Sequence, residues 1–344
     1  MRIKKVNNLL LLIRTKQWWH AVLAFLLGLT YIFIYKFQIQ FDKAIKILPI
    51  IIFLVLFTAI TGYLINNLTD YDEDIHVKKK IANIGKRKSL IIFIIIINLI
   101  AIYIIIGKQN TLWSLFLYLL QFLLFILYSV KPFRLKKHRY LSILLDSLYN
   151  STVFSIFILS FFIPFNSSNF TFISILFLYL WIRGIKNYLS HLIDDRKYDI
   201  KINKTIVHVY GLKKIFRFII ILFVIEFFFV ISFFYTISKH FILFLIGFIV
   251  IYFFRNIVYA LYKKQFKRLI IYFRYVLNDF YENWLPIFTL IMLSLHEVKY
   301  IILLVVHLIV FPNTILQLTE FLAFFYVQIV NLLRKSKIIV KTPF

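Results

Sequence analysis

Long apolar segments recur along the whole chain, and they restrict its fold more than any other feature. Runs such as Leu90–Ile106 and Phe241–Phe254 contain no charged residue. A helix that crosses a bilayer needs ~20 mostly apolar residues, and lipid cannot satisfy the open edges of a sheet. Because 62% of the residues are hydrophobic, a water-soluble domain of this size could not bury them. We therefore predict an all-α, polytopic bundle of about nine transmembrane helices, at 18–37, 44–66, 89–107, 111–129, 141–165, 170–192, 214–236, 239–260 and 280–296.

Basic residues are distributed unevenly between the expected loops. The loops after the second, fourth, sixth and eighth spans are rich in Lys and Arg, whereas the loops between them carry few. Such loops stay on the cytoplasmic side, so we expect the N-terminus and these four loops in the cytoplasm, at the cell membrane. The net charge of +27 fits loops beside anionic membrane lipids better than a nucleic-acid surface, for which no motif is present. The absence of cysteine excludes disulfides and thiol chemistry.

The chain beyond residue 296 is harder to assign to a span. Residues 300–311 are short for one, and residues 315–333 fit either a tenth span or a helix at the membrane surface. We therefore expect a membrane domain at 1–296 and a hydrophobic extension with a basic tail at 297–344.

Half of the acidic residues lie in two short stretches at the expected cytoplasmic ends of the second and sixth spans. The chain has 14 Asp and Glu residues, and seven of them are Asp70, Asp72, Glu73 and Asp74, then Asp194, Asp195 and Asp199. Carboxylates held together raise one another's pKa, so such clusters are costly at a membrane surface without a cation. Their concentration is the strongest functional signal in the sequence.

The spacing within each stretch predicts a polar stripe along a helix. Two sets recur at four-residue intervals: Asn66, Asp70 and Asp74, then His191, Asp195 and Asp199. Side chains four residues apart lie on the same helix face. The same number of residues separates Asp70 from Asp195 and Asp74 from Asp199, and four spans lie between them. We therefore expect two pseudo-repeated four-helix halves whose acidic stripes face each other on one side of the membrane.

Facing aspartate pairs followed by lysines fit a diphosphate bridged by magnesium. Mg²⁺ prefers carboxylate and phosphate oxygens, and Lys or Arg neutralises the remaining phosphate charge. The chemistry this predicts is ionisation of a prenyl diphosphate and attack of the allylic cation on a nucleophilic acceptor, with the departing charge stabilised. The expected catalytic and metal-binding residues are Asp70, Asp74, Asp195 and Asp199, assisted by Asn66. The expected diphosphate-binding residues are Lys79, Tyr128, Arg134, Lys136, Lys201 and Lys204.

At these residues the chain resembles the UbiA superfamily of intramembrane prenyltransferases. Its first motif, Asn-Asp-x-x-Asp-x-x-x-Asp, is carried by Asn66, Asp70 and Asp74, and its second, Asp-x-x-x-Asp, by Asp195 and Asp199. Three further stretches, 14–19, 128–136 and 201–211, resemble family segments, so that the likeness covers roughly residues 10–296. Two departures stand out: Asn67 replaces the usual Asp, and residues 80–85 lack the proline of the usual Arg-Pro-x-x-x-Gly.

The resemblance implies about nine helices around a central cavity that is open to lipid. It also implies transfer of a polyprenyl group to an acceptor, which we expect to be aromatic and similar to 4-hydroxybenzoate. The expected partners are a prenyl diphosphate, this small acceptor and membrane lipids, and the expected cofactor is Mg²⁺. Five residues are candidates to approach the acceptor, although Trp18 also fits a membrane anchor and His191 a polar neighbour: Arg14, Trp18, Arg183, Asn187 and His191.

Other interpretations remain open from the sequence. The acids fit the cation site of a membrane transporter, but such sites lie near the midplane beside broken helices, and these acids lie at helix ends. A non-catalytic binding protein with the same fold would bind prenyl diphosphate without releasing diphosphate. Three polar residues inside spans, Asp146, Asn150 and Glu226, either line the cavity or bond between helices.

Overall fold

The protein is a helical bundle in which eight helices are long and apolar enough to cross a membrane. The computed structural model describes residues 13–76, 87–107, 111–196, 205–263 and 269–335. Within them the candidate spans are Trp19–Lys36, Phe41–Tyr71, Lys88–Ile106, Leu112–Ser129, Leu141–Leu159, Ser167–Asp194, Ile206–Tyr235 and Lys239–Ile257. A bent pair, Val298–Val310 with Pro312–Val327, brings the number to nine if it is counted as one span. The predicted all-α membrane bundle is thus confirmed.

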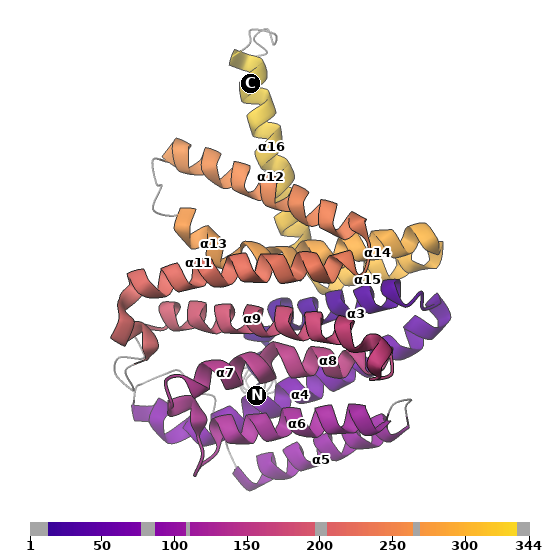
Figure 1. Ribbon diagram of the computed structural model, residues 1–344, viewed down its shortest axis with the longest axis vertical. Coiled ribbons are helices and arrows are strands. Elements are labelled where there is room, and N and C mark those ends of the chain that lie inside the picture. Colours follow the sequence, from indigo (N-terminus) through magenta and orange to yellow (C-terminus); the bar gives the residue numbers. More distant parts are fainter. Residues whose placement is uncertain (1–12, 77–86, 108–110, 197–204, 264–268, 336–344) are drawn as a thin grey trace, which may run out of the picture.

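The spanning helices lie side by side (Figure 1). Helices α5 (Arg87–Ile106) and α6 (Thr111–Ser129) form one edge, and α12 (Lys239–Lys263) forms the opposite edge. Between them lie α4 (Phe41–His76), α7 (Leu141–Ser147), α8 (Val153–Leu159), α9 (Phe170–Asp194) and α11 (Ile206–Tyr235). Helix α3 (Ala24–Lys36) is buried on all sides from Ala24 to Ile34, which is why its sequence is apolar around the whole helix.

The outer helices show why the chain needs a bilayer. Large apolar side chains such as Leu99, Tyr103, Leu112 and Phe228 are more than half exposed on the bundle surface. In water such a surface would drive aggregation, whereas lipid solvates it. The protein is therefore an integral membrane protein.

Small residues set the closest helix contacts. A Cβ added at Gly28 of α3 would lie 2.9 Å from the ring of Pro286, and one added at Gly184 of α9 would lie 2.8 Å from the backbone of Ser147. Glycine at such positions lets helix backbones approach one another in a membrane. Gly184 thus allows α9 to pack closely against α7. These two helices carry polar residues of the central cavity described below.

Among the described residues, three helices contain one turn of π-helix: η1 (Trp19–Leu23), η3 (Leu148–Thr152) and η6 (Phe280–Trp284). These turns fall in the first, fifth and ninth of the helices predicted from sequence. A π-turn inserts one residue into a helix and so redirects the side chains that follow, commonly at functional sites. Each of the three contributes to the lining of a cavity in this protein.

Part of the C-terminal region does not run alongside the other spans. Helix α13 (Leu269–Asp279) continues through η6 into α14 (Leu285–His296), which packs against α3. After a short turn, α15 (Ile301–Val310) and α16 (Pro312–Lys335) meet at 89°. Figure 1 shows α16 running across α12 and then away from the bundle. Residues 301–335 therefore form a short apolar helix and a crossing helix rather than one straight span.

Candidate active site

The first acidic motif lies on α4, which continues as a helix beyond its apolar part to His76. Arg134 Nη2 donates to Asp70 Oδ1 at 2.9 Å and also reaches the Thr69 carbonyl, and Lys136 Nζ forms a second ion pair with Asp70. Asn66 Oδ1 accepts a hydrogen bond from Ser129 Oγ at the end of α6. Two basic side chains from the loop after the fourth span therefore compensate the charge of this carboxylate.

Arg134 is held firmly by the fold. Its side chain is only 7% exposed, and its backbone adopts a left-handed conformation with φ of 38°. A non-glycine residue in this region carries strain that the surroundings must stabilise, and such residues cluster at functional sites. Its amide donates to the Val130 carbonyl at 2.8 Å, its carbonyl accepts from the Lys137 amide at 3.1 Å, and its side chain pairs with Asp70.

The second acidic motif begins where α9 ends. The Asp195 amide closes the last turn on the His191 carbonyl, and the Asp195 carboxylate lies 4.0 Å from His191 Nδ1. The Asp195 side chain is 58% exposed. Its neighbour Asp194 points elsewhere, because Arg274 Nη2 (2.9 Å) and Tyr275 Oη (2.5 Å) both donate to its Oδ2. Asp194 is 52% exposed, so the two aspartates differ in their partners rather than in exposure: two donors engage Asp194, whereas Asp195 lies beside His191.

Some predicted residues lie outside the described part of the chain. Lys79, Asp199, Lys201 and Lys204 fall in its gaps. Asp74 lies on α4, but its side chain is not among those described. Within the described residues no cluster of three or more His, Asp or Glu side chains is close enough to hold a metal ion.

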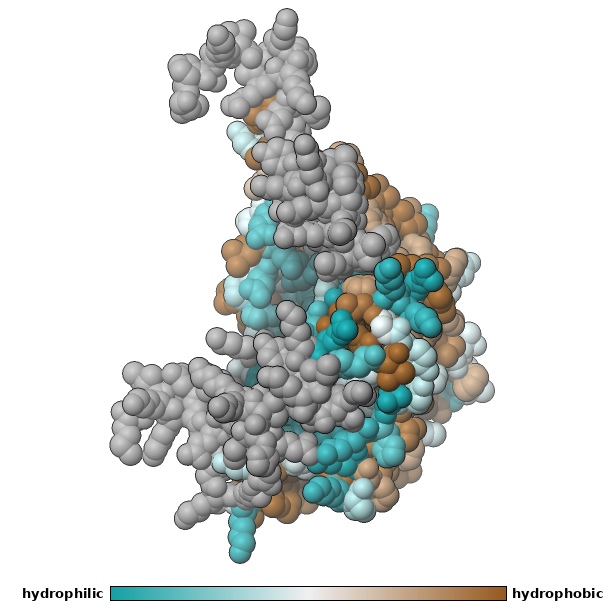
Figure 2. Space-filling model, turned by 90° about the vertical axis from the view of Figure 1, so that its left-hand side faces the viewer, coloured by the Kyte–Doolittle hydropathy of each residue, from teal (hydrophilic) through white to brown (hydrophobic). Residues whose placement is uncertain are grey.

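A central cavity of about 370 Å³ brings the two motifs together. Asn66 of the first motif and Asp195 of the second both line it, whereas Asp70 is not among the lining residues. Figure 2 looks onto the end of the bundle where these motifs lie, and hydrophilic residues gather there among apolar ones. Four more predicted site residues line the cavity: Arg14, Trp18, Tyr128 and His191.

The cavity wall combines apolar and polar side chains. Val22, Leu26, Val55 and Phe154 supply apolar wall, as a hydrocarbon chain requires. Polar residues that the sequence did not single out as site residues also line it: Tyr63, Gln121, Asp146, Tyr149, Asn150 and Tyr188. The signal was present for two of them, because Asp146 and Asn150 are unusual at membrane depth. The tyrosines had no such signal in a chain with 22 of them.

Residues 38–278 match the UbiA prenyltransferase family, which is more than half of the chain. The chain belongs to the UbiA prenyltransferase family. Members of this family are membrane enzymes that transfer prenyl groups, so this chain is a prenyltransferase that uses a prenyl diphosphate and an acceptor. No curated protein sequence matches the chain at a significant level.

Two solved structures share the fold of this UbiA-family protein. The first is a digeranylgeranylglyceryl phosphate synthase, 17% identical, with a TM-score of 0.53 over 90% of this chain and 97% of that one. The second is a UbiA homologue from Archaeoglobus fulgidus bound to Cd²⁺, 13% identical, with a TM-score of 0.51 over 90% of this chain and 99% of that one. At these identities the likeness concerns the fold.

Two predicted acceptor-binding residues of the prenyltransferase do not line the cavity. The Arg183 guanidinium stacks 3.7 Å from the Phe25 ring centroid and lies 3.6 Å from Glu282. Asn187 accepts a hydrogen bond from Asn278 Nδ2 at 3.1 Å. Both side chains therefore point from α9 toward α3 and the α13–η6 helix, and we remove them from the acceptor site. A local sequence pattern does not record which face of α9 meets the cavity.

Glu226, the third polar residue inside a span, bonds between helices. Its carboxylate lies 2.5 Å from Lys186 Nζ of α9, and both side chains are fully buried. A buried charge in a membrane is costly unless it is paired, so this pair joins α9 to α11. Asp146 and Asn150 follow the other interpretation and line the cavity.

Proposed function

We propose that this prenyltransferase is Mg²⁺-dependent and transfers a polyprenyl group from its diphosphate to an aromatic acceptor similar to 4-hydroxybenzoate. The observation that carries the proposal is the central cavity, whose lining combines residues of both acidic motifs with apolar side chains. The proposed active site faces the cytoplasm at the cell membrane, because the motifs lie on the side of the basic loops.

The donor set at the polar end fits a hard divalent cation. Asp195 offers an accessible carboxylate and Asn66 an amide oxygen, and oxygen donors of this kind are preferred by Mg²⁺. Asp70, with Asp74 and Asp199 from the sequence motifs, would complete the set. A bound Mg²⁺ would supply charge neutralisation for the diphosphate leaving group. Magnesium commonly keeps only one or two carboxylate ligands and takes the rest from phosphate, which suits two separate motifs.

Arg134 and Lys136 are the proposed grip on the diphosphate. Both pair with Asp70, which lies one helical turn from the cavity residue Asn66 on α4. Cations fixed before the reaction stabilise the charge that develops on the departing diphosphate without having to reorganise. Tyr128, which lines the cavity from the last turn of α6, would contribute a hydroxyl, and Lys79, Lys201 and Lys204 remain proposed from the sequence.

The cavity walls would protect the allylic cation from water. Apolar side chains exclude solvent, and the rings of Tyr63, Tyr149 and Tyr188 offer electron-rich faces to a carbocation. Arg14, Trp18 and His191 are the remaining proposed acceptor contacts. Arg14 supplies the positive charge that a carboxylate-bearing acceptor needs, and its Nη2 donates to Asn67 at 2.9 Å.

Diphosphate release by the purified protein tests the proposal. Prenyl diphosphates and a pool of acceptors are supplied with Mg²⁺ or with EDTA. We expect release that requires both the metal and an aromatic acceptor. Release with EDTA would refute the metal dependence, and release with only non-aromatic acceptors would refute the acceptor class. Binding of prenyl diphosphate without release across a complete acceptor pool would identify a non-catalytic binder.

A further inference from the structure

A second cavity of about 430 Å³ lies outside the central one, where α16 crosses α12. Helix α12 supplies Phe248, Tyr252, Arg255 and Asn256, α13 and η6 supply Asp279 and Trp284, and α16 supplies Gln317, Glu320, Phe321 and Phe324. No residue is shared with the central cavity. The wall formed by α16 lies beyond residues 38–278, the part that matches the family. This cavity is therefore separate from the proposed active site.

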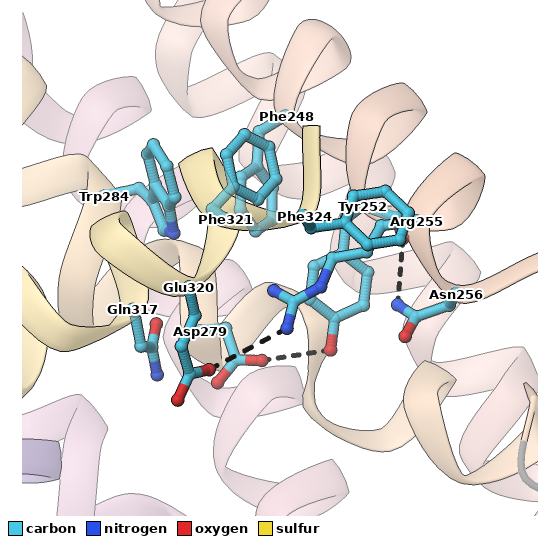
Figure 3. Close-up of a pocket in the computed structure, with 10 residues that line it drawn as sticks. All are labelled: Phe248, Tyr252, Arg255, Asn256, Asp279, Trp284, Gln317, Glu320, Phe321 and Phe324. Atoms are coloured by element: carbon cyan, nitrogen blue, oxygen red, sulfur yellow. Dashed lines mark hydrogen bonds and ion pairs between the residues drawn. The ribbon is translucent and has the colours of Figure 1, made fainter. Parts of the chain in front are cut away.

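Charged groups in this cavity are only partly matched with one another. Arg255 Nη2 lies 3.8 Å from Glu320 Oε2, which is long for an ion pair, and Glu320 is 69% exposed. Asp279 Oδ2 accepts a hydrogen bond from Tyr252 Oη at 3.0 Å. Figure 3 shows both carboxylates and the guanidinium converging on one side of the cavity. Two carboxylates against one guanidinium leave the lining with an excess of negative charge.

Aromatic rings form the other side of the same cavity (Figure 3). Trp284 and Phe321 pack edge to face with ring centroids 4.9 Å apart, and Phe248 lies 5.7 Å from Trp284. Rings beside carboxylates are the usual surroundings for an ammonium group, since the ring faces attract a cation and the carboxylates neutralise it. The excess negative charge and the rings thus favour the same ligand group.

The depth of the cavity indicates where such a ligand comes from. Arg255 and Asn256 lie near the end of the candidate span Lys239–Ile257. The end of a span lies at the level of the lipid headgroups. Exposed apolar side chains, Ile251 and Phe254 of α12 and Leu322 of α16, lie next to the cavity residues in sequence and offer a surface for acyl chains.

We propose that this cavity binds the headgroup of a phospholipid that carries both a phosphate and an ammonium group. The ammonium would contact Asp279, Glu320 and the aromatic rings, and the phosphate would contact Arg255. A volume of about 430 Å³ lies in the range of small-molecule sites. An anionic lipid without an ammonium group would place its charge against two carboxylates. The site is independent of the proposed transfer reaction.

Lipid binding to the full-length protein in detergent tests the proposal. After removal of bound lipid, native mass spectrometry would measure binding of short-chain phosphatidylethanolamine, phosphatidylcholine, phosphatidylglycerol and free phosphoethanolamine, without prenyl diphosphate. We expect one site that binds the first two at least tenfold more tightly than the others. Equal binding of phosphatidylglycerol would overturn the ammonium site, and equal binding of phosphoethanolamine would overturn the lipid as its source.

Matched variants locate the site. We expect Glu320→Gln and Asp279→Asn each to weaken phosphatidylethanolamine binding at least tenfold. Asp42→Asn is the control, because Asp42 is an exposed carboxylate that also lies 3.8 Å from a basic group, Lys299, but outside the cavity. Glu320 is largely exposed, so its variant keeps the test valid if Asp279→Asn fails to fold. Unchanged binding by Glu320→Gln would overturn the assignment.

Discussion

The two acidic motifs occupy corresponding places in the sequence but have different surroundings in the structure. At the first motif, Arg134 and Lys136 from the loop after the fourth span pair directly with Asp70. At the second motif, Arg274, which follows the eighth span, pairs with Asp194 and leaves Asp195 open to the cavity. Each motif thus has a cation beside it, but only in the first motif does the cation pair with the aspartate of the family motif, Asp70.

This difference suggests a division of roles between the motifs. A carboxylate held by two cations orients those cations, whereas an accessible carboxylate is free to take a metal ion. The first motif would therefore organise the diphosphate grip as well as bind metal, and the second would mainly bind metal. Six variants, set out in four comparisons, test this contrast.

Asp70→Asn is expected to have the largest effect, on both activity and stability. Turnover should fall on the order of 10²–10³-fold, because a metal ligand and the anchor of Arg134 and Lys136 are lost together. The free energy of unfolding should fall by about 1–3 kcal/mol, since the nearly buried Arg134 loses its carboxylate partner. Diphosphate-release assays and thermal unfolding in detergent measure the two effects. Full stability in this variant would contradict the engaged state of Asp70.

Asp195→Asn should lower turnover by a similar factor, on the order of 10²–10³-fold, but leave stability within about 0.5 kcal/mol of the parent, because its side chain is largely exposed. Asp194→Asn is the matched control on the adjacent residue, and we expect it to retain turnover within the same order. If Asp194→Asn proved as inactive as Asp195→Asn, the assignment of the metal role to Asp195 rather than to its neighbour Asp194 would fail.

Arg134→Gln and Arg274→Gln compare the two cations. Both arginines are almost buried and pair with an aspartate at 2.9 Å. We expect Arg134→Gln to raise the KM for prenyl diphosphate roughly tenfold, as for the loss of one charge-assisted hydrogen bond. Arg274→Gln should lower thermal stability and leave this KM within about twofold. Equal changes in KM would remove the contrast between Arg134 and Arg274.

Asn67→Asp is expected to have the smallest effect. Asn67 stands where UbiA enzymes usually carry Asp, and it accepts a hydrogen bond from Arg14 at 2.9 Å. A carboxylate there would convert this contact into an ion pair, which should raise stability by up to about 1 kcal/mol. Turnover should stay within the same order of magnitude. A large loss of turnover would show that Arg14 must remain available to the acceptor.

The sequence by itself determined the features that depend on local composition. Spans follow from the length of apolar segments, because each helix in lipid must satisfy its own backbone and expose apolar side chains. The acidic motifs followed from spacing along single helices, and Asn66 and Asp195 do line the central cavity. Tyr128 and Arg14 were also placed there through their motif positions.

Only the tertiary structure decided the features that depend on how helices are rotated against one another. In the structure, Arg183 and Asn187 of α9 point away from the cavity, and Arg274 pairs with Asp194 rather than with Asp195. The tertiary structure also built the second cavity, because α16 bends by 89° from α15 and crosses α12. Hydrophobicity fixes the depth of a residue in the membrane, whereas helix rotation is set by packing of distant side chains, which a local pattern does not record.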